Sequence, residues 1–280
     1  MRSLYSLLLV LIILFSLGAC QPNGSAGIAD DGAVTDSLTY RLDTLRREMD
    51  CMSNRIESPC LQIEIVTVTV TANAADHVLK EINDNLNKAI AQSDNSEQKA
   101  GDAEDVADNL EKEYKRILSE ITDYELPWEL DQNMSVHLNQ DGLFGTTLES
   151  YSFTGGAHGN NFLFHHLYST ETGARLSIKD LVKEEALAEL NRRAELQFRE
   201  SRDIPTGMNY NDAGYWFEDN AFVLPENFKY DPFGLEFVYN TYEIAPYSEG
   251  MITIRFDMAD IENLIRPEYR LISGKEAAGV

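Results

Sequence analysis

Four of the five histidines in this chain lie between positions 137 and 166, a density that suggests metal chemistry. His165 and His166 are adjacent in a segment that we expect to be a β-strand, where neighbouring side chains point to opposite faces. They therefore cannot bind one ion together, and His166 shares its face with aromatic residues that would pack around it. His137 alternates with apolar neighbours and is expected on a polar face. We predict no metal ligands and no cofactor, with a single bound ion as the alternative.

A glycine-rich loop carries the histidine best placed for chemistry, His158. Residues 151–160 read YSFTGGAHGN, and glycines in such a loop allow positive φ and leave backbone amides accessible. The loop could bind an anion or a carbonyl oxygen, with His158 as a hydrogen-bond donor or general acid–base. It lacks the lysine of a phosphate-binding loop and the glycine spacing of a dinucleotide-binding motif. A tight connection between strands, in which His158 caps backbone groups, explains the same pattern.

A second kind of chemistry is covalent and lies at the N-terminus. An apolar stretch runs without a charge from Leu4 to Leu17, and two small residues then precede Cys20. The stretch is shorter than the about 20 apolar residues of a membrane span, so it predicts a signal peptide over residues 1–19. The pattern resembles the bacterial lipobox, which implies that Cys20 carries a diacylglyceryl group and anchors the protein on a membrane. An ordinary signal peptide that leaves a free cysteine is the alternative.

Cys51 and Cys60 stand nine positions apart in a chain that we expect to leave the cytoplasm. An oxidising compartment favours a disulfide between them. Such a bond would stabilise the fold by about 2–3 kcal/mol in the chain-entropy model. Two reduced, partly buried thiols are the alternative. A zinc site is disfavoured, because no histidine lies at ligand spacing from either cysteine.

The net charge of −24 argues against nucleic acid as a partner, because phosphate backbones require a basic surface. Cationic proteins are electrostatically compatible with it. With 43% hydrophobic residues, the chain can bury one sizeable core. No serine lies in a Gly-x-Ser-x-Gly motif, and the acidic residues are too numerous to define a glycosidase pair. The composition therefore favours a binding protein over an enzyme.

The elements that must position these residues begin with a tether, residues 20–36, which is rich in Gly, Ala, Ser and Asp. Residues 37–58 follow with apolar side chains at a 4-3-4-3-4 spacing, which predicts an amphipathic helix. These positions are Leu38, Leu42, Leu45, Met49, Met52 and Ile56. The helix either packs on its own domain or forms an oligomerising stalk. The stalk would create a homo-oligomer through Leu38, Leu42, Leu45 and Met49.

Residues 60–266 are expected to form one module. The β-branched segment 61–71 predicts a strand, whose apolar phase shifts after Ile65 and indicates a β-bulge or burial on both faces. Apolar stripes at helical spacing predict helices over 78–90, 106–121 and 187–198. Alternating patterns predict further strands over 128–139, 143–153, 161–169, 235–241 and 251–257. After about Ile265 the chain is expected to form a short helix end and a frayed tail, with residues 267–280 as the tail.

These patterns predict an α+β fold, since strands occur in blocks separated by helices without regular βαβ alternation. We expect an antiparallel sheet with packed amphipathic helices, preceded by the signal peptide and the short N-terminal helix. The sequence shows no internal repeat.

Two stretches of the sequence resemble a known family. The first reads YSFTGGAHG at 151–159 and continues with Thr172-Gly173 and LSIKDL at 176–181; the second reads LEFVY at 235–239 and YEIAPYSEG at 242–250. Together they resemble the extracytoplasmic domain of RsiV-type lysozyme-sensing anti-sigma factors and the non-catalytic module of PdaC-type peptidoglycan deacetylases. The resemblance covers residues 60–266. It implies an α+β envelope module, which in some relatives binds lysozyme.

We expect neither sigma-factor signalling nor deacetylation from this chain, because the sequence shows neither a cytoplasmic segment ahead of the signal peptide nor a polysaccharide-deacetylase domain. The predicted function is that of a bacterial cell-envelope lipoprotein on the extracytoplasmic side, with a non-catalytic module that binds peptidoglycan or a cationic protein such as lysozyme. In a Gram-negative cell, Gln21 after Cys20 favours the outer membrane and the periplasm. The alternative is a wall-active enzyme in which His158 acts with a carboxylate.

The predicted binding surface combines the glycine-rich loop with the second familiar stretch. Its residues are Tyr151, Gly155, Gly156, His158, Gly159, Tyr242 and Tyr247. Packing of the tyrosines around two strand ends is the alternative, because buried tyrosines are common in cores.

Overall fold

The computed structural model describes residues 37–51, 59–92, 99–121, 124 and 126–271, which lie in one compact unit that extends from Thr35 to Val280. The predicted signal peptide, the predicted lipidation site Cys20 and the predicted tether lie outside these residues. Within the described ranges, none of the helices has the length and apolar character needed to cross a membrane.

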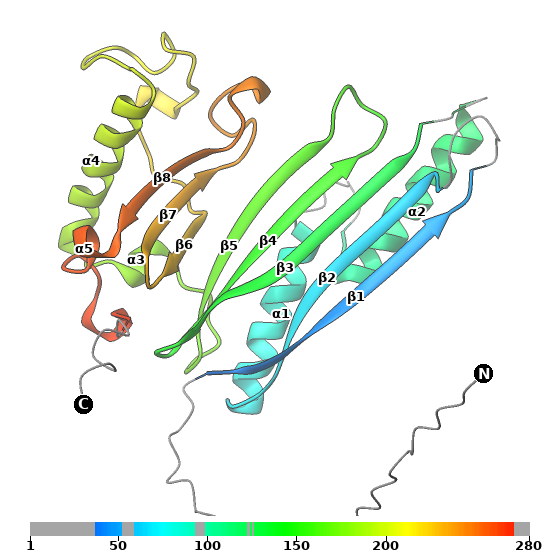
Figure 1. The fold of residues 1–280 in the computed structure, drawn as a ribbon, viewed down its shortest axis with the longest axis horizontal. Coiled ribbons are helices and arrows are strands. Elements are labelled where there is room, and N and C mark those ends of the chain that lie inside the picture. Colours follow the sequence, from blue (N-terminus) through cyan, green and yellow to red (C-terminus); the bar gives the residue numbers. More distant parts are fainter. Residues whose placement is uncertain (1–36, 52–58, 93–98, 122–123, 125, 272–280) are drawn as a thin grey trace, which may run out of the picture. The chain divides into compact units, whose positions relative to one another are not determined.

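A five-stranded sheet forms the larger half of this unit (Figure 1). Its strands, in spatial order, are β1 (Thr39–Met49), β2 (Leu61–Ala72), β3 (Trp128–Gln140), β4 (Leu143–Phe153) and β5 (Asn160–Ser169). The prediction of an antiparallel sheet is wrong at one pair, because β2 and β3 are parallel. A parallel pair needs a long crossover, and α1 (Asp76–Gln92) and α2 (Ala103–Glu120) provide it here. The sheet is therefore mixed, within the predicted α+β class.

Helices α1 and α2 pack on one face of this sheet, as their predicted apolar stripes require (Figure 1). Val78, Ile82 and Leu86 of α1 are buried, as is Tyr114 of α2. On the sheet side they meet alternate residues of β2 and β3, such as Ile63. Strand residues with the opposite parity point away from the helices. The other face carries polar side chains over part of β3 and β4, whereas Leu143 of β4 packs in the core of the smaller half.

The predicted helix over 37–58 is wrong where the structure describes it, because Thr39–Met49 is the edge strand β1. β1 pairs with β2 from Tyr40↔Val70 to Met49↔Leu61. Leu45 and Met49 are half-buried on the helix side, whereas Leu42 is 58% exposed on the other. The apolar residues therefore do not share one stripe, which removes the predicted coiled-coil stalk. Residues 52–58 lie outside the described part of the chain.

Contacts with α2 and backbone pairing with β2 explain why β1 is a strand. Arg47 lies between Leu45 and Met49 in the half-buried row and forms ion pairs with Glu104 and Asp108 of α2. An isolated β2 would present an open row of backbone groups, and pairing with β1 satisfies it. Non-local pairing thus outweighs the local helical pattern.

A three-stranded antiparallel sheet forms the smaller half, with α4 packed against it. It contains β6 (Phe228–Asp231), β7 (Gly234–Tyr239), β8 (Ile252–Asp257) and α4 (Glu184–Ser201), with the one-turn helices α3 (Ile178–Leu181) and α5 (Met258–Ile261) nearby. The strands predicted over 235–241 and 251–257 and the helix predicted over 187–198 are confirmed. The short strand β6 is missed by the sequence pattern.

The chain end contains a short helical turn, as expected, and this turn lies within the predicted tail. Residues 267–269 form a turn of 3-10 helix, and the Tyr230 hydroxyl donates to the Tyr269 carbonyl. Leu271 packs against the core of the smaller half. The remaining residues of the predicted tail, 272–280, lie outside the described ranges.

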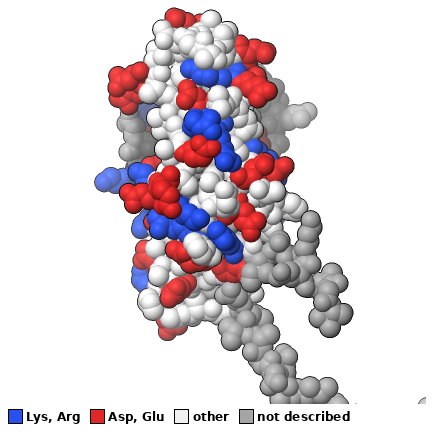
Figure 2. All heavy atoms as spheres, turned by 90° about the vertical axis from the view of Figure 1, so that its left-hand side faces the viewer, with Lys and Arg blue, Asp and Glu red and all other residues white. Residues whose placement is uncertain are grey.

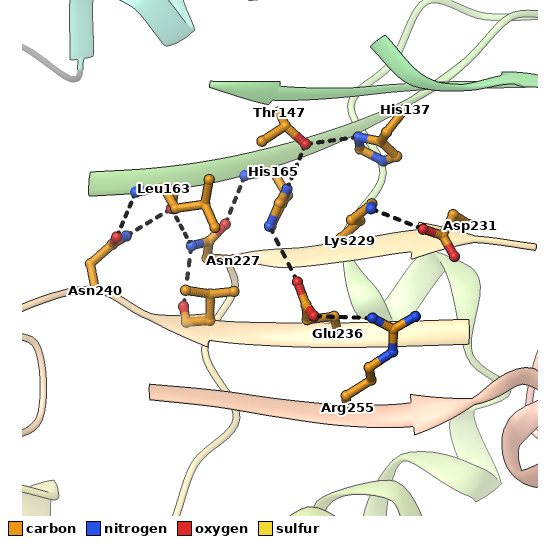
Figure 3. Close-up of polar contacts among 11 residues, drawn as sticks. His137, Thr147, Leu163, His165, Asn227, Lys229, Asp231, Glu236, Asn240 and Arg255 are labelled. Carbon is orange, nitrogen blue, oxygen red and sulfur yellow. Dashed lines mark hydrogen bonds and ion pairs between the residues drawn. The ribbon is translucent and has the colours of Figure 1, made fainter. Parts of the chain in front are cut away.

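Two asparagine side chains join the halves along the outer edge of β5 (Figure 3). The Asn240 side chain accepts from the Leu163 amide at 2.7 Å and donates to the Leu163 carbonyl at 3.0 Å. The Asn227 side chain accepts from the His165 amide at 2.8 Å and also donates to the Leu163 carbonyl at 2.7 Å. A side-chain amide offers the same donor and acceptor as a peptide group. The pair therefore substitutes for a sixth strand.

Candidate functional site

The glycine-rich loop between β4 and β5 holds an aromatic cluster, which consists of His158, Tyr242 and Tyr247. The His158 ring stacks on Tyr247 with 3.7 Å between ring centroids. Its Nδ1 and the Tyr247 hydroxyl both contact the Gly159 carbonyl, at 3.0 and 2.9 Å. Because that carbonyl only accepts, Nδ1 carries the proton and Nε2 is free to accept from the Tyr242 hydroxyl, 3.4 Å away.

Tyr242 reaches His158 through an unusual backbone conformation. Its φ is 68°, in the left-handed region that bulky side chains rarely adopt. The tight turn around it is held by the Glu243 amide donating to the Asn240 carbonyl, and by the Asn240 amide donating to the Glu243 carboxylate. The Tyr242 side chain is nevertheless 51% exposed. The turn thus fixes an aromatic ring in solvent, which core packing does not explain.

The structure brings five of the seven predicted site residues together. Gly159 lies against the ring of Tyr151, which connects this strand residue to the aromatic cluster. Gly155 has a φ of +85° and packs instead against Tyr124 and Trp128. Gly156 is in the loop with open space around it. These two glycines shape the loop, while the surface itself consists of Tyr151 and the aromatic cluster.

Gly159→Ala is expected to destabilise the protein by about 1–3 kcal/mol, because the new methyl group would overlap the Tyr151 ring. Thermal or urea denaturation measures the change. Gly156→Ala is the matched control in the same loop, since its Cβ would come no closer than 3.8 Å to the His158 carbonyl oxygen. Equal effects of the two substitutions would contradict the close packing of Gly159 on Tyr151.

An acidic groove begins at Tyr151 and extends over the sheet face that the helices leave open. The strand register places Arg46, Glu64, Asp131, Tyr151 and Asn161 in one row across the five strands. Arg46 pairs with Glu64 at 2.7 Å. The groove has a volume of about 460 Å³, and Asp131, Tyr151 and Asn161 line it. Phe162, Leu163 and Met251 line it as well, so its lining combines polar and apolar side chains. Tyr151, which packs against Gly159, connects the groove to the loop of the aromatic cluster.

Two carboxylates that line this groove have no basic side chain paired with them among the described residues. Asp131 and Glu149 lie on neighbouring strands, because Asp131 pairs with Tyr151 and Glu149 pairs with Asn133. Like charges at such diagonal positions repel each other. Among the described residues, no basic side chain forms an ion pair with either. The groove therefore carries uncompensated negative charge.

The face of α4 provides the contrast. Figure 2 shows basic and acidic side chains interspersed on this side of the molecule. Arg192 and Arg193 both pair with Glu189, and Arg199 pairs with Glu195. Such pairs are typical of a solvated helix surface. The carboxylates Glu189 and Glu195 of α4 are thus neutralised by arginines, unlike Asp131 and Glu149 in the groove.

The histidines of β3 and β5 are packed inside the fold, with His165 and His166 buried and His137 partly buried. His165 and His166 point to opposite faces, as predicted, because they pair with Thr147 and Thr146. His137 lies in a β-bulge between Val136 and Leu138 and contacts Thr147, the cross-strand partner of Ser135, so it shares the predicted face with Ser135. After the bulge, Asn139 pairs with Phe144 and lies on the other face. Bulges of this kind re-aim a side chain. Among the described residues, no group of three or more ligand-type side chains could hold an ion.

The bulge brings His137 next to His165 (Figure 3). Their rings lie 5.9 Å apart, and the Thr147 hydroxyl is 3.0 Å from the Nδ1 of each. Burial lowers the pKa of His137 to about 3 and that of His165 to about 4. On the helix side, burial lowers the pKa of His166 to about 3, with a smaller contribution from Arg175. All three imidazoles are neutral at pH 7.

Cys51 and Cys60 form a disulfide. It lies next to the last pair of the β1–β2 ladder, Met49↔Leu61, and the Cys60 amide donates to the Met49 carbonyl. The bond therefore closes the end of the two strands.

Two family models match separate segments of the chain. Residues 55–161 match the family model described as Deacetylase PdaC, and residues 179–258 match the model described as Protein of unknown function (DUF3298). No curated protein matches the chain.

Two solved structures are similar to the chain. A DUF3298 family protein from Bacteroides fragilis has a TM-score of 0.63 at 18% identity, covering 86% of this chain and 99% of its own. A DUF3298 family protein from Pseudomonas aeruginosa has a TM-score of 0.59 at 17% identity, covering 84% of this chain and 97% of its own. At these identities the similarity concerns the fold. The chain thus carries a PdaC-type segment followed by a DUF3298-type segment and has the α+β fold of DUF3298 family structures, which confirms the resemblance seen in its sequence.

Proposed function

We propose that this protein is an extracytoplasmic lipoprotein, anchored through Cys20, whose acidic groove and aromatic cluster bind a cationic protein such as lysozyme. The observation that carries the proposal is the uncompensated pair Asp131 and Glu149 beside Tyr151. The PdaC-type segment supports a place in the cell envelope, because the sequence resembles a module of peptidoglycan deacetylases.

The groove suits basic side chains for a physical reason. A lysine or arginine placed between Asp131 and Glu149 would relieve their mutual repulsion and gain charge-assisted hydrogen bonds. The exposed rings of Tyr242 and His158 are within the same surface, and an arginine can also stack on a tyrosine. A strongly negative protein attracts a cationic partner over a distance, which raises the association rate and makes it sensitive to salt.

Lysozyme titrated into the purified protein tests this proposal. We expect binding at about 50 mM salt that weakens strongly at about 300 mM, where charges are screened over a shorter distance. The double variant D131N/E149Q is expected to weaken binding by about tenfold, which corresponds to about 1.4 kcal/mol. Calorimetry or surface plasmon resonance measures both effects.

The matched control changes the net charge equally but elsewhere. Glu262 and Glu268 are exposed residues outside the groove, so E262Q/E268Q should leave the affinity within about twofold if the groove is the site. Equal losses in the two double variants would mean that overall charge, rather than the groove, attracts lysozyme. No binding at low salt would refute the lysozyme version.

A cell-wall glycan is a second candidate, favoured by the exposed rings of the aromatic cluster. Sugar rings present apolar faces that pack on aromatic side chains, and the groove offers amides and carboxylates for hydroxyl groups. Tyr242→Ala would then reduce the retention of the protein on insoluble peptidoglycan. Retention equal to that of the unmodified protein would remove the glycan from consideration.

The alternative of a wall-active enzyme receives no support from His158. Its ring nitrogens contact the Gly159 carbonyl and the Tyr242 hydroxyl, whereas a general acid–base of the predicted kind works with a carboxylate. Turnover of peptidoglycan fragments that disappears in His158→Ala would restore the alternative.

A further inference from the structure

The outer edge of β5 carries a gap in its hydrogen bonding. The Thr170 amide donates to the Gly142 carbonyl, which shows that even-numbered residues of β5 direct their backbone groups toward β4. In an antiparallel ladder the alternate residues direct theirs to the opposite edge. The backbone groups of Leu163, His165 and Leu167 therefore point outward, toward the smaller half.

Partners on both sides leave one rung of this edge open. Asn240 and Asn227 occupy the backbone of Leu163 and the amide of His165 (Figure 3). Further along, the Leu176 amide donates to the Leu167 carbonyl. The chain then leaves the edge, because Ser177 caps the short helix α3. Among the described residues, no hydrogen bond reaches the His165 carbonyl or the Leu167 amide on this side.

A pocket of about 390 Å³ lies beside this open rung. Its walls come from the last turn of α1, at Gln92, and from Phe164 and His166 of β5. The His166 side chain is 7% exposed, and its Nδ1 has no hydrogen-bond partner among the described residues. Buried polar atoms are normally satisfied. The pocket thus offers both backbone and side-chain groups to a polar ligand.

Charges of opposite sign line the two ends of the pocket. Glu226 and Glu243 lie next to the asparagines, at the end nearer Leu163. Arg175 lies at the other end, where its backbone pairs with Tyr168. The acidic end thus corresponds to the N-terminal part of β5 and the basic end to its C-terminal part. This polarity matches a peptide that runs parallel to β5.

We propose that this pocket binds a short zwitterionic peptide in an extended conformation, added parallel to the edge of β5. One residue of the peptide would donate its N–H to the His165 carbonyl and accept from the Leu167 amide, as in a parallel ladder. Its amino group would lie near Glu226 and Glu243, and its carboxylate near Arg175. The site is separate from the acidic groove and does not depend on the function proposed above.

Tri-L-alanine is the probe that tests this proposal on the purified protein. In a ¹H–¹⁵N spectrum, we expect saturable shifts of the Leu167 amide, because a new hydrogen bond forms there. Arg175→Gln is expected to weaken binding by about tenfold. Arg192→Gln, which removes a similar exposed arginine from α4, should leave it within about twofold.

Two further measurements separate a specific site from weak adhesion. Acetylated and amidated tri-alanine lacks both charges and should bind at least about tenfold more weakly. Gln92→Trp fills the rim of the pocket from an exposed position and should abolish binding without unfolding the protein. The proposal is overturned if tri-L-alanine gives no saturable shift, or if its binding is unchanged in both Arg175→Gln and Gln92→Trp.

Discussion

Acidification from pH 7 to pH 5 is expected to lower the free energy of unfolding by about 2 kcal/mol for each of the three histidines His137, His165 and His166. In the folded state, burial holds the pKa of His165 at about 4 and that of His137 and His166 at about 3. In the unfolded chain a histidine titrates near pH 6.5. The unfolded state therefore binds more protons below pH 6.5. These histidines therefore have little effect on stability above pH 6.5. As the pH decreases below 6.5, the free energy of unfolding falls until the pH reaches the pKa values of the folded state.

The groups around these histidines offer little to stabilise a proton. Lys229 lies close enough to lower the pKa of both His137 and His165, and Asp231 raises it by less. The Glu236 carboxylate is 4.0 Å from His165 Nε2 but also contacts Arg255 at 3.7 Å. On the helix side, Arg175 disfavours a charge on His166. Burial and the nearby cations thus act in the same direction.

Urea denaturation at pH 7 and pH 5 measures this loss. His165→Gln removes one titrating group and is expected to reduce the difference between the two pH values, whatever its effect on stability at pH 7. His77→Gln is the control, because His77 is exposed on α1. Equal unfolding free energies at the two pH values would show that the histidines are accessible to protons in the folded protein.

Phe198→Ala is expected to cost about 3–5 kcal/mol of unfolding free energy, the usual range for a buried phenylalanine. The Phe198 side chain is fully buried on α4. Its ring centroid lies 5.0 Å from that of Tyr215, 5.5 Å from that of Phe217 and 5.6 Å from that of Phe222. These aromatics come from the loop between α4 and β6, which contains little regular structure. Loss of Phe198 removes the ring on which this loop packs.

Chemical denaturation, followed by tyrosine fluorescence, measures the effect of Phe198→Ala. Leu196→Ala on the same helix is the control, because Leu196 is 55% exposed and such surface substitutions usually change stability by no more than about 0.5 kcal/mol. A loss below about 1 kcal/mol in Phe198→Ala would mean that the aromatic residues rearrange to fill the cavity.

Local patterns predicted most of the fold because they report burial directly. The stripe of α1 from Val78 to Ile90 and the alternation of β8 are clean signals, and both are confirmed. The helix prediction for β1 was wrong because its apolar residues fit a helical period. The conformation of β1 is set by its pairing with β2, which local sequence does not show. The parallel pairing of β2 and β3 is likewise invisible to a local pattern.

The candidate site was likewise predicted from the sequence only in part. Tyr151, His158, Tyr242 and Tyr247 were found through two sequence motifs. In the structure, His158 stacks on the two other tyrosines and Tyr151 packs against the neighbouring Gly159. The acidic groove was missed, since only the strand register shows that Asp131 and Glu149 are neighbours. The pairing of His137 with His165 was missed because it depends on the bulge.

The two asparagine side chains that cover the edge of β5 have a consequence for the synthesis and folding of this chain. β5 is complete at Ser169, but the side chains that cover its edge lie 62 and 77 residues beyond their partners. A chain that emerges from its N-terminus therefore exposes a bare strand edge until Asn240 appears, and such edges promote aggregation. The five-stranded sheet is thus expected to need a chaperone, or rapid completion of the smaller half, during biogenesis.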